Sequence, residues 1–202
     1  MKLRLLIVLT LSYCIALLSQ GTSTELVDMA ELIPKLKIKI KYATTDNFTK
    51  QKLYPIGKAF GTLPVTKSLN VINDSLAKQG LGIMIFDGYR PRAIQWFLWD
   101  IMPNSGFVAD PRTGSRHNRG CAMDLTLYDL NTGEELAMPT PFDEFSERAN
   151  HNYQNLPEEV IKNRAILKNI MTTNGFDLYN VEWWHYEHIE SFNYPLKECQ
   201  MR

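Results

Sequence analysis

Strand-like patterns of apolar and polar residues recur along the chain. Residues 36–42 and 121–128 alternate between the two kinds with a period of two, which predicts strands with one buried face. Residues 81–86 form a continuous apolar run of strand length and predict a central strand. Residues 176–179 and 181–189 predict a final pair of strands.

Helical spacing of apolar residues separates these strands. It predicts helices over residues 65–79, 93–102 and 157–173. The apolar side of the first helix is expected to carry Leu69, Val71, Ile72 and Leu76. Between these elements, residues 103–114 are rich in Pro, Gly and Asn, and residues 139–156 are irregular and polar, so we expect loops there and consider the second a candidate active-site loop. We therefore expect a single α+β domain, with helices packed on a mostly antiparallel central sheet.

The first 23 residues have the pattern of a secretory signal peptide. Residues 1–4 are basic, residues 5–18 are mostly apolar, and small polar residues follow. The apolar run is shorter than the ~20 residues that a membrane-spanning helix needs, which favours cleavage over an uncleaved anchor or lipidation at Cys14. We expect a mature catalytic domain over residues 24–202 that is exported to the periplasm or the exterior and has no stable membrane association.

Charge and cysteine content narrow the possible partners. Lys+Arg and Asp+Glu balance at 22 each, so the chain has no net positive charge that would favour binding to nucleic acid or to an anionic membrane. After cleavage two cysteines remain, Cys121 and Cys199, and an oxidising compartment would permit a disulfide. The sequence leaves open whether they pair and whether the chain forms oligomers.

Two separated segments supply residue types typical of a catalytic zinc site. His117 and Asp124 lie where a loop leads into a strand, and Gly120 between them permits a tight turn. His185 would come from a distant strand, and three such ligands leave one coordination position for a water whose pKa the metal lowers. Glu182 lies three residues before His185, so a turn or bulge is required if both are to face the same site.

Arg90 is a further candidate, because it follows the apolar run 81–86 in a sharp turn. A cation fixed there can stabilise an oxyanion. Taken singly, each candidate has a simpler explanation. For His117 and Asp124 it is a solvated ion pair. For Glu182 it is an exposed acid beside aromatic packing, and for Arg90 it is a side chain that binds loop carbonyls. Arg92 is expected at the surface.

Taken together, the motifs resemble one family. Asp87-Gly88-Tyr89-Arg90-Pro91, Ser115-x-His117-x-x-Gly120-x-Ala122-x-Asp124-Leu125 and Glu182-Trp183-Trp184-His185 are similar to the zinc D-alanyl-D-alanine dipeptidases linked to vancomycin resistance, in peptidase family M15. The resemblance extends roughly from Leu36 to His185.

The resemblance implies a role for each matching residue. His117, Asp124 and His185 would bind one zinc ion per chain. Glu182 would be the general base and then acid, and Arg90 would stabilise the oxyanion. Asp143 would hold the substrate's free ammonium group, while Tyr42 and Ser115 would line the pocket.

We therefore expect a zinc enzyme that hydrolyses D-Ala-D-Ala, a small D,D-dipeptide, in cell-wall peptide turnover. A D,D-carboxypeptidase or endopeptidase acting on peptidoglycan stem peptides is the alternative, because the stretch between Arg90 and Ser115 is shorter than in the resistance-type enzymes and implies a more open cleft. A non-enzymatic binding module is disfavoured, because structural zinc normally has four protein ligands.

Overall fold

The computed structural model describes residues 24–200, which form a single α+β domain. The expected signal peptide, residues 1–23, lies outside the described residues. The elements, in chain order, are β1 (Leu26–Asp28), α1 (Met29–Leu32), β2 (Lys37–Ile38), β3 (Phe60–Thr62), α2 (Leu63–Ala77), β4 (Leu81–Asp87), α3 (Arg92–Ile101), β5 (Ala122–Asp129), α4 (Glu158–Thr172), β6 (Phe176–Leu178) and β7 (His185–His188). Short 3₁₀ turns cover Lys41–Ala43, His117–Arg119, Glu147–Ala149 and Ile189–Ser191.

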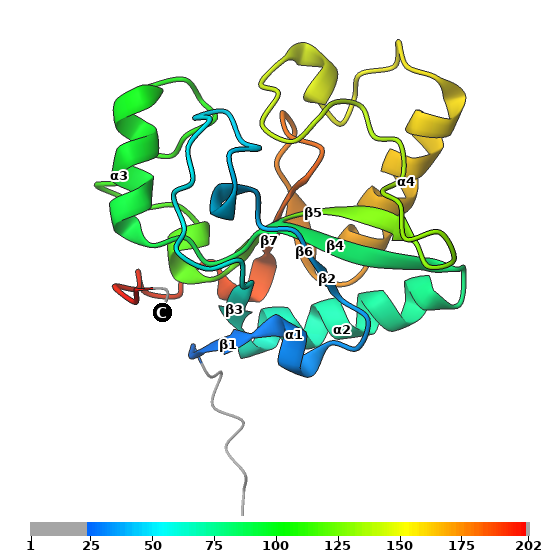
Figure 1. The fold of residues 1–202 in the computed structure, drawn as a ribbon, viewed down its shortest axis with the longest axis horizontal. Coiled ribbons are helices and arrows are strands. Elements are labelled where there is room, and N and C mark those ends of the chain that lie inside the picture. Colours follow the sequence, from blue (N-terminus) through cyan, green and yellow to red (C-terminus); the bar gives the residue numbers. More distant parts are fainter. Residues whose placement is uncertain (1–23, 201–202) are drawn as a thin grey trace, which may run out of the picture.

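Five strands form the central sheet, in the order β2-β4-β5-β7-β6. Only the β2–β4 pair within it is parallel, and the other pairs are antiparallel. A two-stranded antiparallel sheet of β1 and β3 lies beside it. The prediction of a mostly antiparallel α+β domain is thus confirmed. In Figure 1, α2 runs along one side of the sheet, while α3 and the long loops lie on the other.

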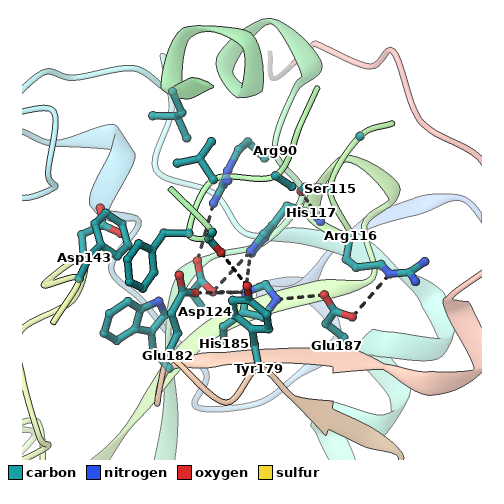
Figure 2. A pocket seen from close by; sticks show the side chains of 18 of the residues that line it. Arg90, Ser115, Arg116, His117, Asp124, Asp143, Tyr179, Glu182, His185 and Glu187 are labelled. Atoms are coloured by element: carbon teal, nitrogen blue, oxygen red, sulfur yellow. Dashed lines mark hydrogen bonds and ion pairs between the residues drawn. The ribbon is translucent and has the colours of Figure 1, made fainter. Parts of the chain in front are cut away.

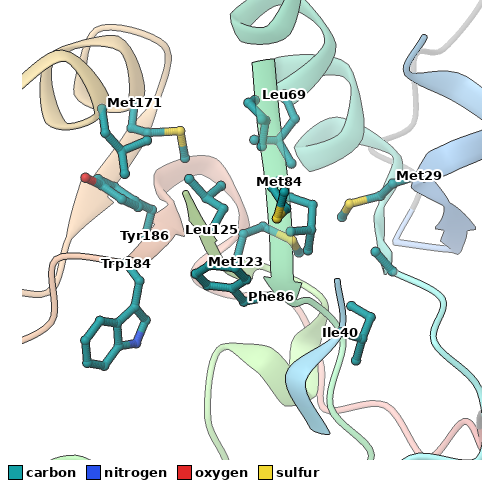
Figure 3. Packing of buried hydrophobic residues seen from close by; sticks show 14 of the residues in the cluster. Met29, Ile40, Leu69, Met84, Phe86, Met123, Leu125, Met171, Trp184 and Tyr186 are labelled. Carbon is teal, nitrogen blue, oxygen red and sulfur yellow. The ribbon is translucent and has the colours of Figure 1, made fainter. Parts of the chain in front are cut away.

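Alternation along β5 explains how one strand serves both the core and the site. Met123 and Leu125 are fully buried in the apolar cluster, and Asp124 between them points to the opposite face. Figure 3 shows Leu125 and Met123 packed among side chains from α2, β4, β7 and α4. Because the core residues fix the register of β5, they also fix where Asp124 points.

Three details of the predicted pattern are wrong. Of the strand expected at residues 181–189, only His185–His188 is a strand, because the chain turns before it. The strand expected at residues 36–42 is confined to Lys37–Ile38, because the chain then enters the 3₁₀ turn at Lys41–Ala43. Asn47 holds this turn, since its side-chain amide donates to the carbonyl oxygens of Lys41, Thr44 and Gln51. On α2, Val71 is 54% exposed, so it lies outside the apolar face that Leu69, Ile72 and Leu76 form.

Cys121 and Cys199, the two cysteines among the described residues, are both free. Cys121 is buried and its thiol donates to the carbonyl oxygen of Ser191, whereas Cys199 is exposed. Among the described residues no helix has the length and apolar character to cross a membrane.

Candidate metal centre and active site

Three side chains converge above the sheet from the elements that the sequence indicated. Asp124 and His185 are direct cross-strand neighbours on β5 and β7, so the sheet itself places them side by side. His117 comes from the 3₁₀ turn before β5, which ends at Gly120 with a left-handed φ of 70°. One ligand atom from each of the three residues lies within 4.8 Å of the others.

The hydrogen-bonding pattern prepares His117 to bind a cation. Its Nδ1 lies 2.8 Å from the carbonyl oxygen of Gly88, and a carbonyl can only accept, so Nδ1 carries the proton. In the neutral ring, which carries one proton, Nε2 then has the lone pair; it lies 3.2 Å from His185 Nδ1 and 3.4 Å from Asp124 Oδ1. Two imidazole nitrogens and a carboxylate aimed at one point suit zinc, with a further position left open.

Charge on the cluster follows from burial and from close partners. Burial works to raise the pKa of Asp124, but the two histidines outweigh it and hold that pKa well below the usual range. Burial works to lower the pKa of His185, but hydrogen bonds to Asp124 and Glu187 raise it to about 10. A bound cation would replace the proton that Asp124 and His185 share.

Glu182 reaches the cluster from the turn that the sequence required. It precedes β7, and the amide of His185 donates to the carbonyl oxygen of Glu182. This turn brings Glu182 Oε2 to 4.0 Å from His185 Nδ1. Burial raises the pKa of Glu182 to about 8, and a cation bound nearby would oppose that rise. The adjacent Trp183 and Trp184 are core residues, 2% and 1% exposed.

Arg90 is held at the rim of the sheet by side chains rather than by loop carbonyls. Its Nε and Nη2 donate to Asp87 Oδ2 at 3.0 and 2.9 Å, and its Nη1 donates to Gln95 Oε1 at 3.0 Å. Nη2 also lies 3.8 Å from Asp124 Oδ2, so the guanidinium faces the cluster. Arg92 is partly exposed and pairs with Glu198.

Asp143 lies across the pocket from His117, as Figure 2 shows. Its carboxylate accepts from the hydroxyl of Tyr42 at 3.3 Å and from the amide of Phe48 at 3.2 Å. Burial raises its pKa to about 7, although the Phe48 amide opposes the rise. Its φ of 61° is left-handed, a conformation that Asp and Asn tolerate better than most residues.

All eight residues singled out in the sequence line one pocket of about 400 Å³. They are Tyr42, Arg90, Ser115, His117, Asp124, Asp143, Glu182 and His185. Ser115 lies at the wall, where its Oγ accepts from the amide of His117 at 3.0 Å. The pocket thus places a candidate metal-ligand set, a buried acid and a fixed cation around one volume, as metal-dependent hydrolytic enzymes do.

Comparison with known proteins also indicates a metal-dependent hydrolytic enzyme. A family model described as Peptidase M15, D-ala-D-ala dipeptidase, matches residues 22–199. The chain is 38% identical over 178 residues to the D-alanyl-D-alanine dipeptidase of Escherichia coli (strain K12), covering 86% of this chain and 90% of that one. It is 36% identical over 196 residues to that of Enterococcus faecium, covering 83% and 96%.

The chain therefore belongs to the M15 family of D-alanyl-D-alanine dipeptidases and is a metallopeptidase, for which family and donor set indicate zinc. It also aligns with the solved structure of the LdcB LD-carboxypeptidase at 18% identity and a TM-score of 0.46, covering 81% of this chain and 67% of that one.

Sequence reasoning missed the side chains that support the site. Asp87 and Tyr54 are in this group: the Tyr54 hydroxyl donates to Asp87 Oδ1 at 2.9 Å, which orients the partner of Arg90. Gln95 and Glu187 are also in it. Asp87 had a visible signal, because it opens the motif that contains Arg90, and so did Glu187, because residues 185 and 187 of one strand share a face.

Proposed function

We propose that the enzyme hydrolyses D-Ala-D-Ala to two D-alanines, with one zinc ion held by His117, Asp124 and His185. The observation that carries the proposal is the position of Asp143, which shares one pocket with this cluster, Glu182 and Arg90. When bound, zinc would polarise the peptide carbonyl and lower the pKa of water. The naming of the relatives as D-alanyl-D-alanine dipeptidases supports the same substrate.

Asp143 would select for a free amino terminus. Its carboxylate is the acidic group on the wall that Tyr42 and Phe48 form, and an ammonium bound there would pair with it. Anchoring the ammonium group places the first peptide carbonyl over the cluster of His117, Asp124 and His185. An acylated nitrogen, as in a stem peptide, has no charge to offer and adds bulk at the same wall.

Glu182 would carry the proton through the reaction. As water adds to the carbonyl carbon, its proton passes to the carboxylate of Glu182, and the same proton then goes to the leaving nitrogen as the C–N bond breaks. Arg90 would stabilise the negative charge that develops on the carbonyl oxygen. Because Asp87 and Gln95 already hold the guanidinium, little reorganisation accompanies the step.

The test is release of D-alanine from D-Ala-D-Ala by the zinc-loaded chain, with an amidated stem pentapeptide assayed in parallel. The proposal predicts fast release from the dipeptide, loss of release after chelation, and recovery when zinc is restored. Release from the pentapeptide alone would instead assign the enzyme to stem-peptide trimming. Release that chelation leaves unchanged would contradict the metal site.

Export of the enzyme is a separate proposal, which rests on the basic, apolar and small polar segments of residues 1–24. Outside the cytoplasm the substrate would be dipeptide derived from the cell wall. Amino-terminal sequencing of the protein from cell fractions tests this. Export predicts a start near residue 24 in the exported fraction, whereas an intact amino terminus in the cytosol contradicts it.

A further inference from the structure

Glu187 lies behind one metal-ligand candidate, away from the residues that handle substrate. On β7, residues 185 and 187 face the pocket, while Tyr186 and His188 point into the core, where they are 0% and 3% exposed. Glu187 Oε1 lies 3.3 Å from Nε2 of His185. The opposite nitrogen of that ring, Nδ1, is the one that joins the cluster.

This arrangement bears on the tautomer of His185. A neutral imidazole carries one proton, and only the nitrogen without it can bind a metal. A carboxylate can only accept, so Glu187 holds a proton on Nε2. Without a metal, Asp124 accepts the second proton of the ring from Nδ1; a bound metal would replace that second proton, and the Nδ1 lone pair would then face the metal while Glu187 keeps the proton on Nε2. The carbonyl oxygen of Gly88 acts on His117 in the same way, from the other side of the cluster.

Arg116 in turn holds Glu187. Its Nε lies 3.5 Å from Glu187 Oε2, and its guanidinium lies over the ring of Phe192, 4.5 Å from the centroid. It also donates from Nη1 to the carbonyl oxygen of Phe192. Because Arg116 directly precedes His117, the Arg116–Glu187 pair joins the turn that carries one ligand to the strand that carries another, as Figure 2 shows.

We propose that Glu187 is a positioning residue: it fixes the tautomer and ring orientation with which His185 binds the metal, and Arg116 keeps its carboxylate in place. The proposal rests on the metal site of the proposed function. Glu187 itself contacts neither the expected position of the ammonium group at Asp143 nor Arg90. Its effect should therefore appear in metal affinity before any effect on substrate.

The test is the zinc affinity of purified variants, measured by competition with a chromophoric chelator. Glu187→Ala should bind zinc about 10- to 100-fold more weakly than the unaltered chain, which is the usual cost of losing such a partner. Glu187→Gln, whose amide oxygen can still accept from Nε2, should recover most of the affinity. Glu190→Gln, at an exposed acid three residues on, is the matched control and should change nothing.

A spectroscopic measurement separates positioning from general damage to the fold. The visible absorption of the cobalt(II)-loaded chain depends on ligand geometry, so it should change in Glu187→Ala and return in Glu187→Gln. Unchanged zinc affinity in Glu187→Ala would overturn the proposal, as would equal losses in the Ala and Gln variants. Failure of the unaltered chain to bind zinc would instead overturn the metal site itself.

Discussion

At the scale of single residues, charged groups in the site are fixed by partners from other segments. Asp87 is fully buried, and its carboxylate receives Arg90 at two nitrogens and the hydroxyl of Tyr54. Such charge-assisted bonds hold a guanidinium in one orientation. The carboxylate of Glu182 lies 4.0 Å from His185 Nδ1, beyond hydrogen-bonding distance, which suits a group that takes up and releases a proton.

The role of Glu182 makes a specific prediction. Glu182→Gln keeps the size of the side chain but removes its basicity, so kcat on the dipeptide should fall about 10²- to 10⁴-fold. Zinc affinity should stay within a few-fold of the unaltered chain, because the proposed ligands are His117, Asp124 and His185. Steady-state kinetics and chelator competition on the same samples provide the check. Near-full turnover would rule out the assigned role.

Metal chemistry restricts residue types strongly, so the sequence could single out candidates that the structure then brings together in one pocket. His117, Asp124, His185 and Glu182 were identifiable from motifs. Gln95 was not, because its importance depends on a contact with Arg90 that exists only once α3 packs against the turn after β4. Its second bond, from Nε2 to the carbonyl oxygen of Ala109, likewise requires the folded loop.

At the scale of elements, the loop over residues 103–114 forms part of the pocket wall. The ring of Phe107 stacks on Phe145 with centroids 4.7 Å apart. Beside it, the hydroxyl of Tyr179 donates to the carbonyl oxygen of Gly106 at 2.6 Å. Phe145 also contacts Phe48, whose amide binds Asp143. These aromatic rings therefore adjoin the wall where residues upstream of a dipeptide would have to pass.

Removing one ring should relax selectivity for length. Phe107→Ala should raise kcat/KM for a tripeptide ending in D-Ala-D-Ala, relative to that for the dipeptide, on the order of tenfold, because it removes steric exclusion. Phe107→Leu, which keeps most of the bulk, is the matched control. If the ratio of the two kcat/KM values stays constant in Phe107→Ala, the loop does not set substrate length.

Element boundaries were less predictable than element types. The alternation at residues 36–42 runs further than the strand itself. The last hydrogen bond to the neighbouring strand is donated by the amide of Lys39 to the carbonyl oxygen of Ile85, and the chain then turns away. The bonds of Asn47 that end this strand come from a residue outside the pattern. By contrast, the turn at Glu182 was foreseen, because strand geometry alone cannot place Glu182 and His185 together.

At the scale of the whole molecule, the sheet separates a core face from a site face, and the loops enclose the site. The chain after β7 strengthens this enclosure: the Lys197 amide donates to the carbonyl oxygen of Asn118, and Arg119 donates to that of Tyr194. The turn that carries His117 is therefore held from outside as well as by the sheet. Sequence periodicity carried no sign of these contacts, because they join irregular segments.

Stability should depend on pH through His151, which is 3% exposed. Burial lowers its pKa from 6.5 to about 4, with Lys168 and Arg164 adding to the effect. Between these values the unfolded chain binds the proton and the folded chain does not, so stability is complete above about pH 6.5 and is lost as pH falls towards 4. The loss from this group between pH 7.5 and 5 is roughly 2 kcal/mol.

Chemical denaturation of the metal-free chain at both pH values measures this loss. His151→Phe keeps a ring at the position but does not titrate, so its free energy of unfolding should fall less between pH 7.5 and 5 than that of the unaltered chain. Other titrating groups are common to both proteins and cancel in the comparison. An identical pH dependence in the two proteins would show that His151 does not carry the effect.

The central claim is that an ammonium anchored at Asp143 beside the metal cluster makes this enzyme a dipeptidase. The most direct test compares kcat/KM of the zinc-loaded chain for D-Ala-D-Ala and for its N-acetylated form. We predict that acetylation lowers kcat/KM on the order of a hundredfold or more, since it leaves the Asp143 carboxylate unpaired. Asp143→Asn, which tolerates the same left-handed backbone, should lose most of this preference. Equal or faster hydrolysis of the acetylated dipeptide by the unaltered chain would contradict the account.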